Sequence, residues 1–228
     1  MAMKKSLLQI SLLLPLIFIF SSCFELIEDT TFNKDGSGVY KVTLNMSSSQ
    51  TRLNSVMAMD SIDGKKVPSE KDLQNEIESF IADLNSQEGI KNAKASLSTE
   101  EWILKFSCTF DDLEALKNGL NLSTKKWQKK DQKIGDYFEV NFSNAGYERI
   151  INTEVSDRWK TKASEDEDYN KLKEGKCVFI QRFPNQISSV SNVNVKIAKN
   201  GTACMLMLSP HEIIQNPKSL NYSVSLEE

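Results

Sequence analysis

The sequence contains a single histidine, His211, and it lacks the short motifs of several large enzyme classes. One histidine cannot supply the two imidazole ligands of many zinc sites. His211 also stands at the start of a predicted helix, where the helix dipole disfavours the charged imidazole. No serine lies in a Gly-x-Ser-x-Gly motif, and no phosphate-binding or dinucleotide-binding glycine pattern occurs. The sequence therefore predicts no catalytic residue, no metal site and no cofactor.

Carboxylate pairs are present, but each consists of neighbours in the sequence. The pairs are Glu28 with Asp29, Glu100 with Glu101, and Asp111 with Asp112. Neighbouring residues of a strand point to opposite faces, so these pairs do not predict the facing carboxylates of a glycosidase. The segment around Asp35 lacks the alternating oxygen ligands of a calcium loop and is predicted to be a turn.

An excess of positive charge is also absent. The chain has 28 Lys and Arg against 31 Asp and Glu, and a formal net charge of −3. A mildly acidic chain gains no affinity from counterion release on DNA or RNA. We therefore expect no nucleic-acid partner.

No apolar run in the sequence is long enough to cross a bilayer. The main run covers residues 10–20, whereas a spanning helix needs roughly 20 apolar residues. Two lysines precede the run and two serines follow it, which is the pattern of a cleaved export signal. We predict that residues 1–22 are a signal peptide and that a single domain covers residues 23–228.

The end of this signal, Phe20-Ser21-Ser22-Cys23, resembles a bacterial lipobox. The resemblance implies that Cys23 is lipidated, that it becomes the first residue, and that its acyl chains bind the membrane. A plain secretory signal with an incidental cysteine is the alternative. The residue after the cysteine is Phe24 and not Asp, which resembles the sorting signal of outer-membrane lipoproteins. We therefore expect an outer membrane lipoprotein on the periplasmic face. Nearby acidic residues leave surface exposure open.

Three further cysteines, Cys108, Cys177 and Cys204, allow at most one disulfide bond. Cys108 and Cys204 lie on the apolar faces of predicted strands. We expect both to be reduced and buried, where they act as small apolar side chains. A bridge in an exported domain is the alternative.

Alternating apolar residues and turn motifs predict three β-hairpins separated by helices. The hairpins cover residues 24–46, 90–110 and 177–208, and the last residues, 221–227, form an edge strand. Helices are predicted after Ser47, over 69–84, over 112–120, around 144–155 and over 209–216. Ser69 with Asp72 resembles a capping box, and Ser209 precedes a proline that suits the first helical position.

These elements predict an α+β fold with a mostly antiparallel sheet built from β-hairpins and helices packed on one face. The apolar residues of the second hairpin, Trp102, Leu104, Phe106, Cys108 and Phe110, share one face. We expect a filled core, because burial of each such side chain contributes roughly 1.5–3 kcal/mol. The charged tract 157–176 is predicted to be an exposed insert.

A basic tract with a tryptophan is the candidate binding surface. It consists of Lys125, Lys126, Trp127, Lys129 and Lys130, within a predicted exposed loop at 123–136. Clustered lysines beside an aromatic ring suit an anionic lipid headgroup or an acidic glycan. A solvated loop without a ligand is the alternative.

Two stretches carry a resemblance to known lipoproteins: FELIEDTTFNKDGSGVYKVTLNMS after Cys23, and the tail FPNQISSVSNVNVKIAKNGTACMLMLSPHEIIQNPKSLNYSVSL. Both resemble a group of uncharacterised Bacteroidota lipoproteins. More remotely, the chain is similar to LppM-type envelope lipoproteins, whose α+β domain has been linked to lipid binding. The shared motifs are turns and strands, so the resemblance implies no catalytic residue.

The sequence thus favours a lipid-anchored envelope protein that acts as a non-catalytic binding or scaffolding module, with an envelope protein or a lipid as partner. The alternative is a lipid-binding or glycolipid-binding domain with an apolar pocket between sheet and helices. A hydrolase with carboxylate chemistry is less favoured.

Overall fold

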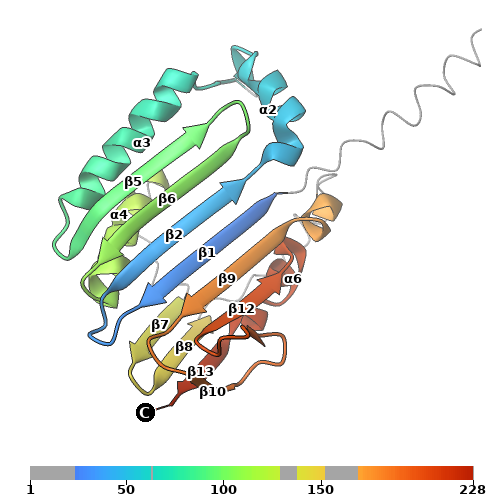
Figure 1. The fold of residues 1–228 in the computed structure, drawn as a ribbon. Helices are drawn as coiled ribbons and strands as arrows, with labels where there is room; N and C mark the ends of the chain where they lie inside the picture. The colour runs from blue at the N-terminus through green and yellow to red at the C-terminus, as the bar shows by residue number, and fades with distance from the viewer. Residues whose placement is uncertain (1–23, 63, 129–137, 152–168, 228) are drawn as a thin grey trace, which may run out of the picture.

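The fold is built on a seven-stranded sheet in the strand order β11-β12-β9-β1-β2-β6-β5 (Figure 1). The computed structural model describes residues 24–62, 64–128, 138–151 and 169–227. β1 and β9 run parallel, and the other neighbours in this sheet are antiparallel. Its strands are β1 (Glu25–Phe32), β2 (Gly38–Asn45), β5 (Ile90–Ser98), β6 (Ile103–Phe110), β9 (Lys176–Arg182), β11 (Lys196–Ile197) and β12 (Ala203–Leu208).

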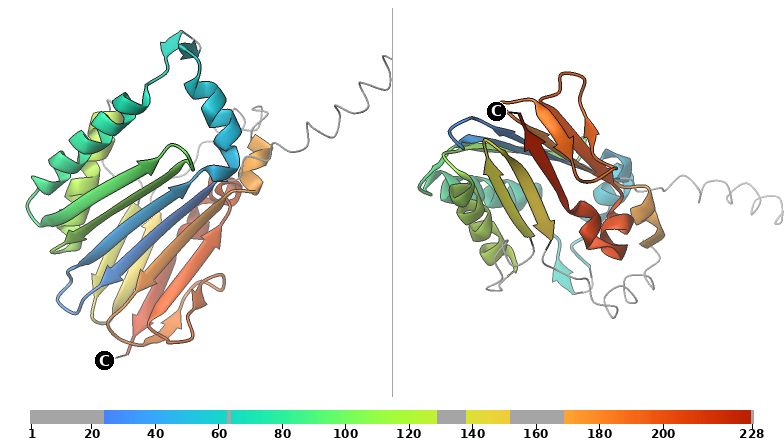
Figure 2. Two further views of the ribbon diagram at one scale, coloured as in Figure 1. Left: turned by 45° about the horizontal axis from the view of Figure 1, so that its top comes forward. Right: turned by 90° about the horizontal axis from the view of Figure 1, so that it is seen from below.

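A second sheet of four strands and the two longest helices lie on one side of the large sheet (Figure 2). The second sheet has the order β10-β13-β8-β7. Helix α3 lies along β5, and α4 lies against β5 and β6. This arrangement confirms the predicted α+β class. The bounds are β7 (Phe138–Ser143), β8 (Gly146–Ile151), β10 (Ile187–Val190), β13 (Tyr222–Leu226), α3 (Glu70–Asn85), α4 (Leu113–Gln128) and α6 (Pro210–Gln215).

The strand register defines an inner face of the large sheet, directed toward the second sheet and the helices. On β1, Phe32 and Glu28 contact residues of the second sheet, so the even-numbered residues of this strand point inward. Asp29 points outward and binds Arg182. The inner residues on the neighbouring strands are Tyr40, Val42 and Leu44 on β2, Leu104, Phe106, Cys108 and Phe110 on β6, and Cys177, Phe179 and Gln181 on β9.

The aromatic part of the core lies between the two sheets, at the end of β1 remote from Phe24. Phe32 stacks on Phe142 with 4.2 Å between ring centroids, and it contacts Phe110, Tyr147 and Phe183. Burial of each ring contributes about 2–3 kcal/mol, so this cluster holds the sheets together.

A glycine is required where this core meets β2. A Cβ atom on Gly38 would lie 2.1 Å from the carbonyl oxygen of Thr31 and 2.4 Å from the ring of Phe110. No side chain fits at that position without displacing the backbone or the ring.

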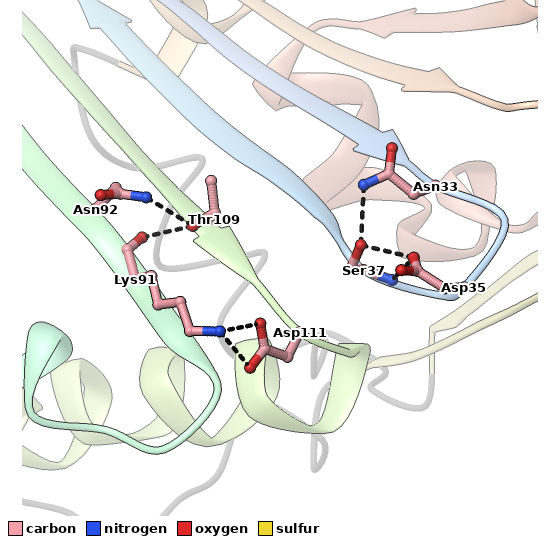
Figure 3. Close-up of polar contacts among 7 residues, drawn as sticks. All are labelled: Asn33, Asp35, Ser37, Lys91, Asn92, Thr109 and Asp111. Atoms are coloured by element: carbon pink, nitrogen blue, oxygen red, sulfur yellow. Dashed lines mark hydrogen bonds and ion pairs between the residues drawn. The ribbon is translucent and has the colours of Figure 1, made fainter.

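Residues 33–37 form the turn between β1 and β2, which confirms the turn predicted around Asp35 (Figure 3). Asp35 Oδ1 accepts hydrogen bonds from the backbone N–H and the hydroxyl of Ser37, at 3.1 and 2.7 Å. Asn33 donates to the same hydroxyl at 2.9 Å, and Gly36 has a φ of 87°. The Asp35 carboxylate thus holds the turn.

Helix starts follow the predicted capping residues. Ser69 and Asp72 form a capping box at the start of α3, and Ser209 and Glu212 form another at α6. Each serine hydroxyl accepts a backbone N–H of the first turn, while the acidic side chain accepts the N–H of the serine.

The predicted helix around 144–155 is wrong over its described part, because residues 146–151 form strand β8. Tyr147 and Arg149 are buried, whereas Glu148 between them is exposed. This is an alternation of period two, and β8 pairs with β7 on one side and β13 on the other. β13 is therefore an inner strand of the small sheet and not the predicted edge strand.

Three further predictions need correction. Residues 123–128 continue α4 and do not form a loop. Within the predicted insert, Tyr169–Lys173 forms a 3-10 helix (η4) with Tyr169 buried, while residues 157–168 lie outside the described part. Trp102 precedes β6 with a φ of 54°, so it belongs to the turn and not to the strand face.

Candidate functional site

The lipidation site and part of the basic tract lie outside the described residues. These are Cys23, Lys129 and Lys130. Lys125, Lys126 and Trp127 lie in the last two turns of α4. The anchor and the anionic-ligand surface therefore stay predictions. Within the described ranges, no helix has the length and apolar character needed to cross a membrane.

The paired carboxylates point to separate partners. Glu28 binds Arg149 at 3.2 Å on the inner side of β1, and Asp29 binds Arg182 at 2.9 Å on the outer side. Asp111 forms an ion pair with Lys91 at 2.8 Å (Figure 3). Asp112 instead accepts the backbone N–H of Ala115, also at 2.8 Å, in the first turn of α4. Neighbours in sequence thus carry out different structural roles.

The three cysteines of the domain are buried free thiols, as expected for Cys108 and Cys204. Burial raises the pKa of Cys108 and of Cys177 to about 11, and that of Cys204 to about 12. Neutral, buried thiols are poor nucleophiles. Their role is packing on the inner face.

His211 lies in the first turn of α6, and its ring is 5.2 Å from the ring of Tyr169. Tyr169 belongs to η4, and its hydroxyl is hydrogen bonded to Gln215 at the end of α6. The histidine therefore helps to join two short elements. Across the described ranges, no cluster of three or more His, Cys, Asp or Glu side chains could hold a metal ion.

A strip of partly exposed apolar side chains covers the inner face of the large sheet beside α3. One row consists of four leucines on four neighbouring strands, paired in register as Leu26, Leu44, Leu104 and Leu97. The next row contains Val42, Phe106 and Ala95, and Tyr40 follows. All of these side chains are only partly buried. We call these eight residues the inner strip.

On the same strands, the inner-face side chains at the other end are fully buried, so the strip differs from the rest of this face in its exposure. Phe110 and Cys108 on β6 are 1% and 2% exposed, and Phe32 on β1 is 2% exposed. Leu104 and Phe106, on the same strand and the same face, are not buried. The inner face is therefore fully buried at one end and only partly buried at the other.

Helix α3 forms one wall of the strip. The ring of Phe80 is 5.8 Å from that of Phe106, and Tyr40 meets the other side of Phe106 at 6.2 Å with an edge-to-face angle of 64°. Ile77, one turn before Phe80, is also partly exposed. Aromatic and aliphatic groups thus form a continuous apolar surface that is partly open.

A buried ion pair borders the strip. Glu28 lies in the same row as Val42, and its side chain is 21% exposed, whereas Arg149 opposite is 5% exposed. Burial works against the charge of Arg149, but Glu28 and nearby tyrosines outweigh it and raise the pKa of the guanidinium. Arg149 also lies 4.4 Å above the ring of Phe179. One edge of the apolar strip is therefore polar and electrically balanced.

Further polar groups lie behind this pair. Tyr222 is hydrogen bonded to Gln181, whose side-chain Nε2 has no hydrogen-bond partner although Gln181 is only 1% exposed. Burial, followed by the charge of Glu28, raises the pKa of Tyr40 well above its usual value. The tyrosine hydroxyls thus stay neutral and can donate hydrogen bonds. The arrangement offers a long apolar surface with hydroxyl and carboxylate groups at one edge.

Sequence reasoning placed Leu104 and Phe106 on one face of their strand, but it did not single out Leu26, Leu97 or Ala95 and did not show that the strip is partly open. It also missed Arg149, because the segment was assigned to a helix. Two signals were available: Glu28 interrupts an apolar face of β1, and Arg149 falls between Tyr147 and Ile151 at a spacing of two.

No protein-family model matches the chain, and no curated protein matches it either. A solved structure that is similar is the NMR structure of the folded domain of LppM from Mycobacterium tuberculosis. The match covers 90% of this chain and 89% of that domain, with 11% identity and a TM-score of 0.43. The Bacteroidota group stays a prediction.

Proposed function

We propose that this protein is a lipid-anchored, non-catalytic binding protein of the cell envelope whose domain binds an amphipathic lipid on the inner strip. Attachment through Cys23 to the outer membrane, facing the periplasm, is part of this proposal. The observation that carries it is the inner strip, which consists of eight partly exposed side chains, seven of them apolar and one a tyrosine. At the other end of the same strands, the side chains of this face are fully buried.

Leaving such a surface partly in water has a free-energy cost. Each Å² of apolar area removed from water contributes about 25 cal/mol of stabilising free energy. An acyl chain laid along the strip would cover this area and so contribute the free energy that is missing in the free protein. A protein whose only role is to hold partners on its surface has no need for an open inner face. The strip therefore favours the lipid-binding alternative over pure scaffolding.

The position of the strip fits a ligand that arrives from the membrane. Leu26 is two residues from Phe24, so the leucine row lies at the end of the sheet where the predicted anchor joins the domain. The carboxylate of Glu28 and the hydroxyl of Tyr40 lie further along, where a polar group of the lipid could accept or donate hydrogen bonds.

An anionic headgroup is a further part of the proposal. The basic tract of Lys125, Lys126, Trp127, Lys129 and Lys130 begins in the last two turns of α4, a helix on the same side of the sheet as the strip. Clustered lysines attract anionic headgroups, and the effect weakens with salt. We expect ligands with a phosphate or another anionic group to bind more tightly at low ionic strength.

The test compares two tryptophan substitutions at adjacent residues of β5. Ala95 lies within the strip, beside Phe106, whereas Ser96 lies on the exposed outer face of the same strand. Ala95→Trp should fill the strip, and Ser96→Trp should leave it open. The chain from residue 24 onward is extracted with organic solvent after purification, and the lipid per protein is measured by mass spectrometry.

We expect a stoichiometric lipid with the unchanged chain and with Ser96→Trp, and at least a severalfold lower amount with Ala95→Trp. Circular dichroism and thermal unfolding confirm that both variants fold. Absence of lipid from all three folded proteins, together with no rise in melting temperature on addition of phospholipid, would contradict lipid binding and restore the scaffolding interpretation.

A further inference from the structure

Between the first sheet strands and α3, the chain forms an arm that contributes nothing to the buried core. The arm consists of a 3-10 helix, η2 (Ser47–Ser49), helix α2 (Gln50–Met57) and the two-residue strands β3 (Ser61–Ile62) and β4 (Lys65–Lys66). Neither η2 nor α2 has a buried residue. Figure 2 shows α2 leading away from the sheet and the chain returning along α3.

The tip of the arm exposes apolar side chains. Met59 is 51% exposed and Ile62 is 38% exposed. Ile62 pairs with Lys65, and Ser61 pairs with Lys66, so two exposed lysines accompany the apolar tip. Apolar side chains with lysines beside them are typical of segments that enter the interface of a bilayer, where the lysines reach the headgroups.

The base of the arm lies beside the point where the predicted anchor joins the domain. Asn45, the last residue of β2, pairs with Glu25, the first residue of β1. Cα atoms of paired residues in antiparallel strands are about 5 Å apart. Cys23 precedes Glu25 by two residues, which span at most about 7 Å. No spacer therefore separates the acyl chains from the folded domain, and this end of the sheet must stay close to the membrane surface.

The base of the arm is held to the second hairpin. The indole N–H of Trp102 donates to the side-chain oxygen of Asn54 on α2 at 2.7 Å, and Gln50 is hydrogen bonded to the carbonyl of Glu100. The backbone N–H of Met46 donates to the carbonyl of Trp102 at 2.9 Å. Trp102 is 5% exposed and has a φ of 54°, a conformation that is rare for a bulky residue. This left-handed turn fixes the direction in which α2 leaves the sheet.

We propose that the arm is a second membrane contact, in which Met59 and Ile62 enter the lipid interface next to the acyl chains of Cys23. The partner is the surface of the membrane that holds the anchor, and the inference rests on the proposed anchoring. A short tether and a fixed arm together give the domain one orientation, with the leucine row of the inner strip next to the bilayer. Contact with the membrane thus gives a function to an arm that contributes nothing to the buried core.

The test places a polarity-sensitive fluorophore at the tip of the arm in the full-length protein. Met59→Cys is labelled with a nitrobenzoxadiazole dye after reconstitution into vesicles of phosphatidylethanolamine and phosphatidylglycerol. The thiols of Cys108, Cys177 and Cys204 are buried and free, so unsubstituted protein reports the background labelling. Ile197→Cys is the matched control, because Ile197 is 44% exposed but lies far from the anchor. Ile197 pairs with Cys204, Cys204 with Gln181, and Gln181 with Thr30. Thr30 lies about 17 Å along β1 from Glu25.

We expect a blue-shifted emission at position 59 that is quenched by nitroxide-labelled lipids, and an unshifted, unquenched emission at position 197. Flotation of the vesicles and incorporation of an acyl-chain analogue at Cys23 are measured on the same samples. An acylated protein that floats while the dye at position 59 stays in water overturns the arm contact alone. A protein that carries no acyl chain and does not float overturns the anchoring and the arm contact together.

Discussion

The thiols of Cys108, Cys177 and Cys204 all lie on the inner face of the large sheet, among apolar side chains. Burial raises the pKa of each thiol. Burial also raises the pKa of Tyr147, and of Tyr40 and Tyr222. These residues pack well only in their neutral forms.

Alkaline conditions should therefore destabilise the protein. The unfolded chain releases these protons near the ordinary pKa values, about 8.5 for a thiol and 10 for a tyrosine, while the folded chain retains them. Above about pH 8.5 the unfolded state binds fewer protons, so the free energy of unfolding falls as pH rises. We expect the fall to continue to about pH 11, the pKa of buried Cys108 and Cys177. Urea unfolding between pH 7 and 11 measures it.

Cys177→Ala serves as the comparison for this pH series. The substitution removes one thiol whose pKa is raised by burial. The free energy of unfolding of the variant should therefore decline less steeply above pH 8.5 than that of the unchanged protein. A flat stability profile up to pH 10.5 in the unchanged protein would show that the thiols and phenols are not buried as described.

At the scale of elements, α3 is part of the candidate site, because its residues Phe80 and Ile77 lie along the inner strip. The residues that cap α3 therefore also support the site. Ser69 is its N-cap, and the Asp72 carboxylate accepts both the hydroxyl and the backbone N–H of Ser69. These hydrogen bonds lower the pKa of Asp72. The first turn of the helix is thus held by two side chains.

Ser69→Ala should lower the free energy of unfolding by about 1 kcal/mol, because one backbone N–H of the first turn loses its acceptor. Asn75→Ala, an exposed change within the same helix, should leave stability unchanged or raise it slightly, since alanine has the higher helix propensity. Guanidinium unfolding of both variants gives the comparison. Equal stability of the two variants would mean that the capping box does not form.

Local signals in the sequence predicted the elements that depend on local chemistry. The hairpin turn at Gly36, the capping box at Ser69 and the helix start at Pro210 are each determined by neighbouring residues. Strand β8 was not predicted, although Tyr147 and Ile151 alternate with its inward Arg149, because Arg149 is stabilised by Glu28, a residue 121 positions away in the chain. No pattern within β8 records that partner.

The candidate site was predictable only in part for the same reason. The alternation of Leu104 and Phe106 placed both on one face, and Val42 and Leu44 likewise. Whether that face is fully covered depends on how far α3 and the second sheet extend over it, and this is a property of the tertiary structure. The sequence therefore predicted part of the strip and not its openness.

At the scale of the whole molecule, the four-stranded sheet and the helices α3 and α4 lie on one side of the large sheet, and they cover it unevenly (Figure 2). The covered end holds the aromatic cluster around Phe32, and the partly open end holds the leucine row. The open end is also the end at which β1 begins and the arm leaves the sheet (Figure 1). Anchor, arm and strip thus belong to one end of the domain, which we propose faces the membrane.

Photo-crosslinking tests the central claim, lipid binding on the inner strip, most directly. The full-length protein in vesicles is irradiated with a phospholipid that carries a diazirine on its acyl chain, and the modified peptides are identified by mass spectrometry. We expect modification of residues 40–44 and 104–106, on two neighbouring strands, and its loss in Ala95→Trp but not in Ser96→Trp. Modification confined to other parts of the domain, or unchanged in Ala95→Trp, would contradict this claim.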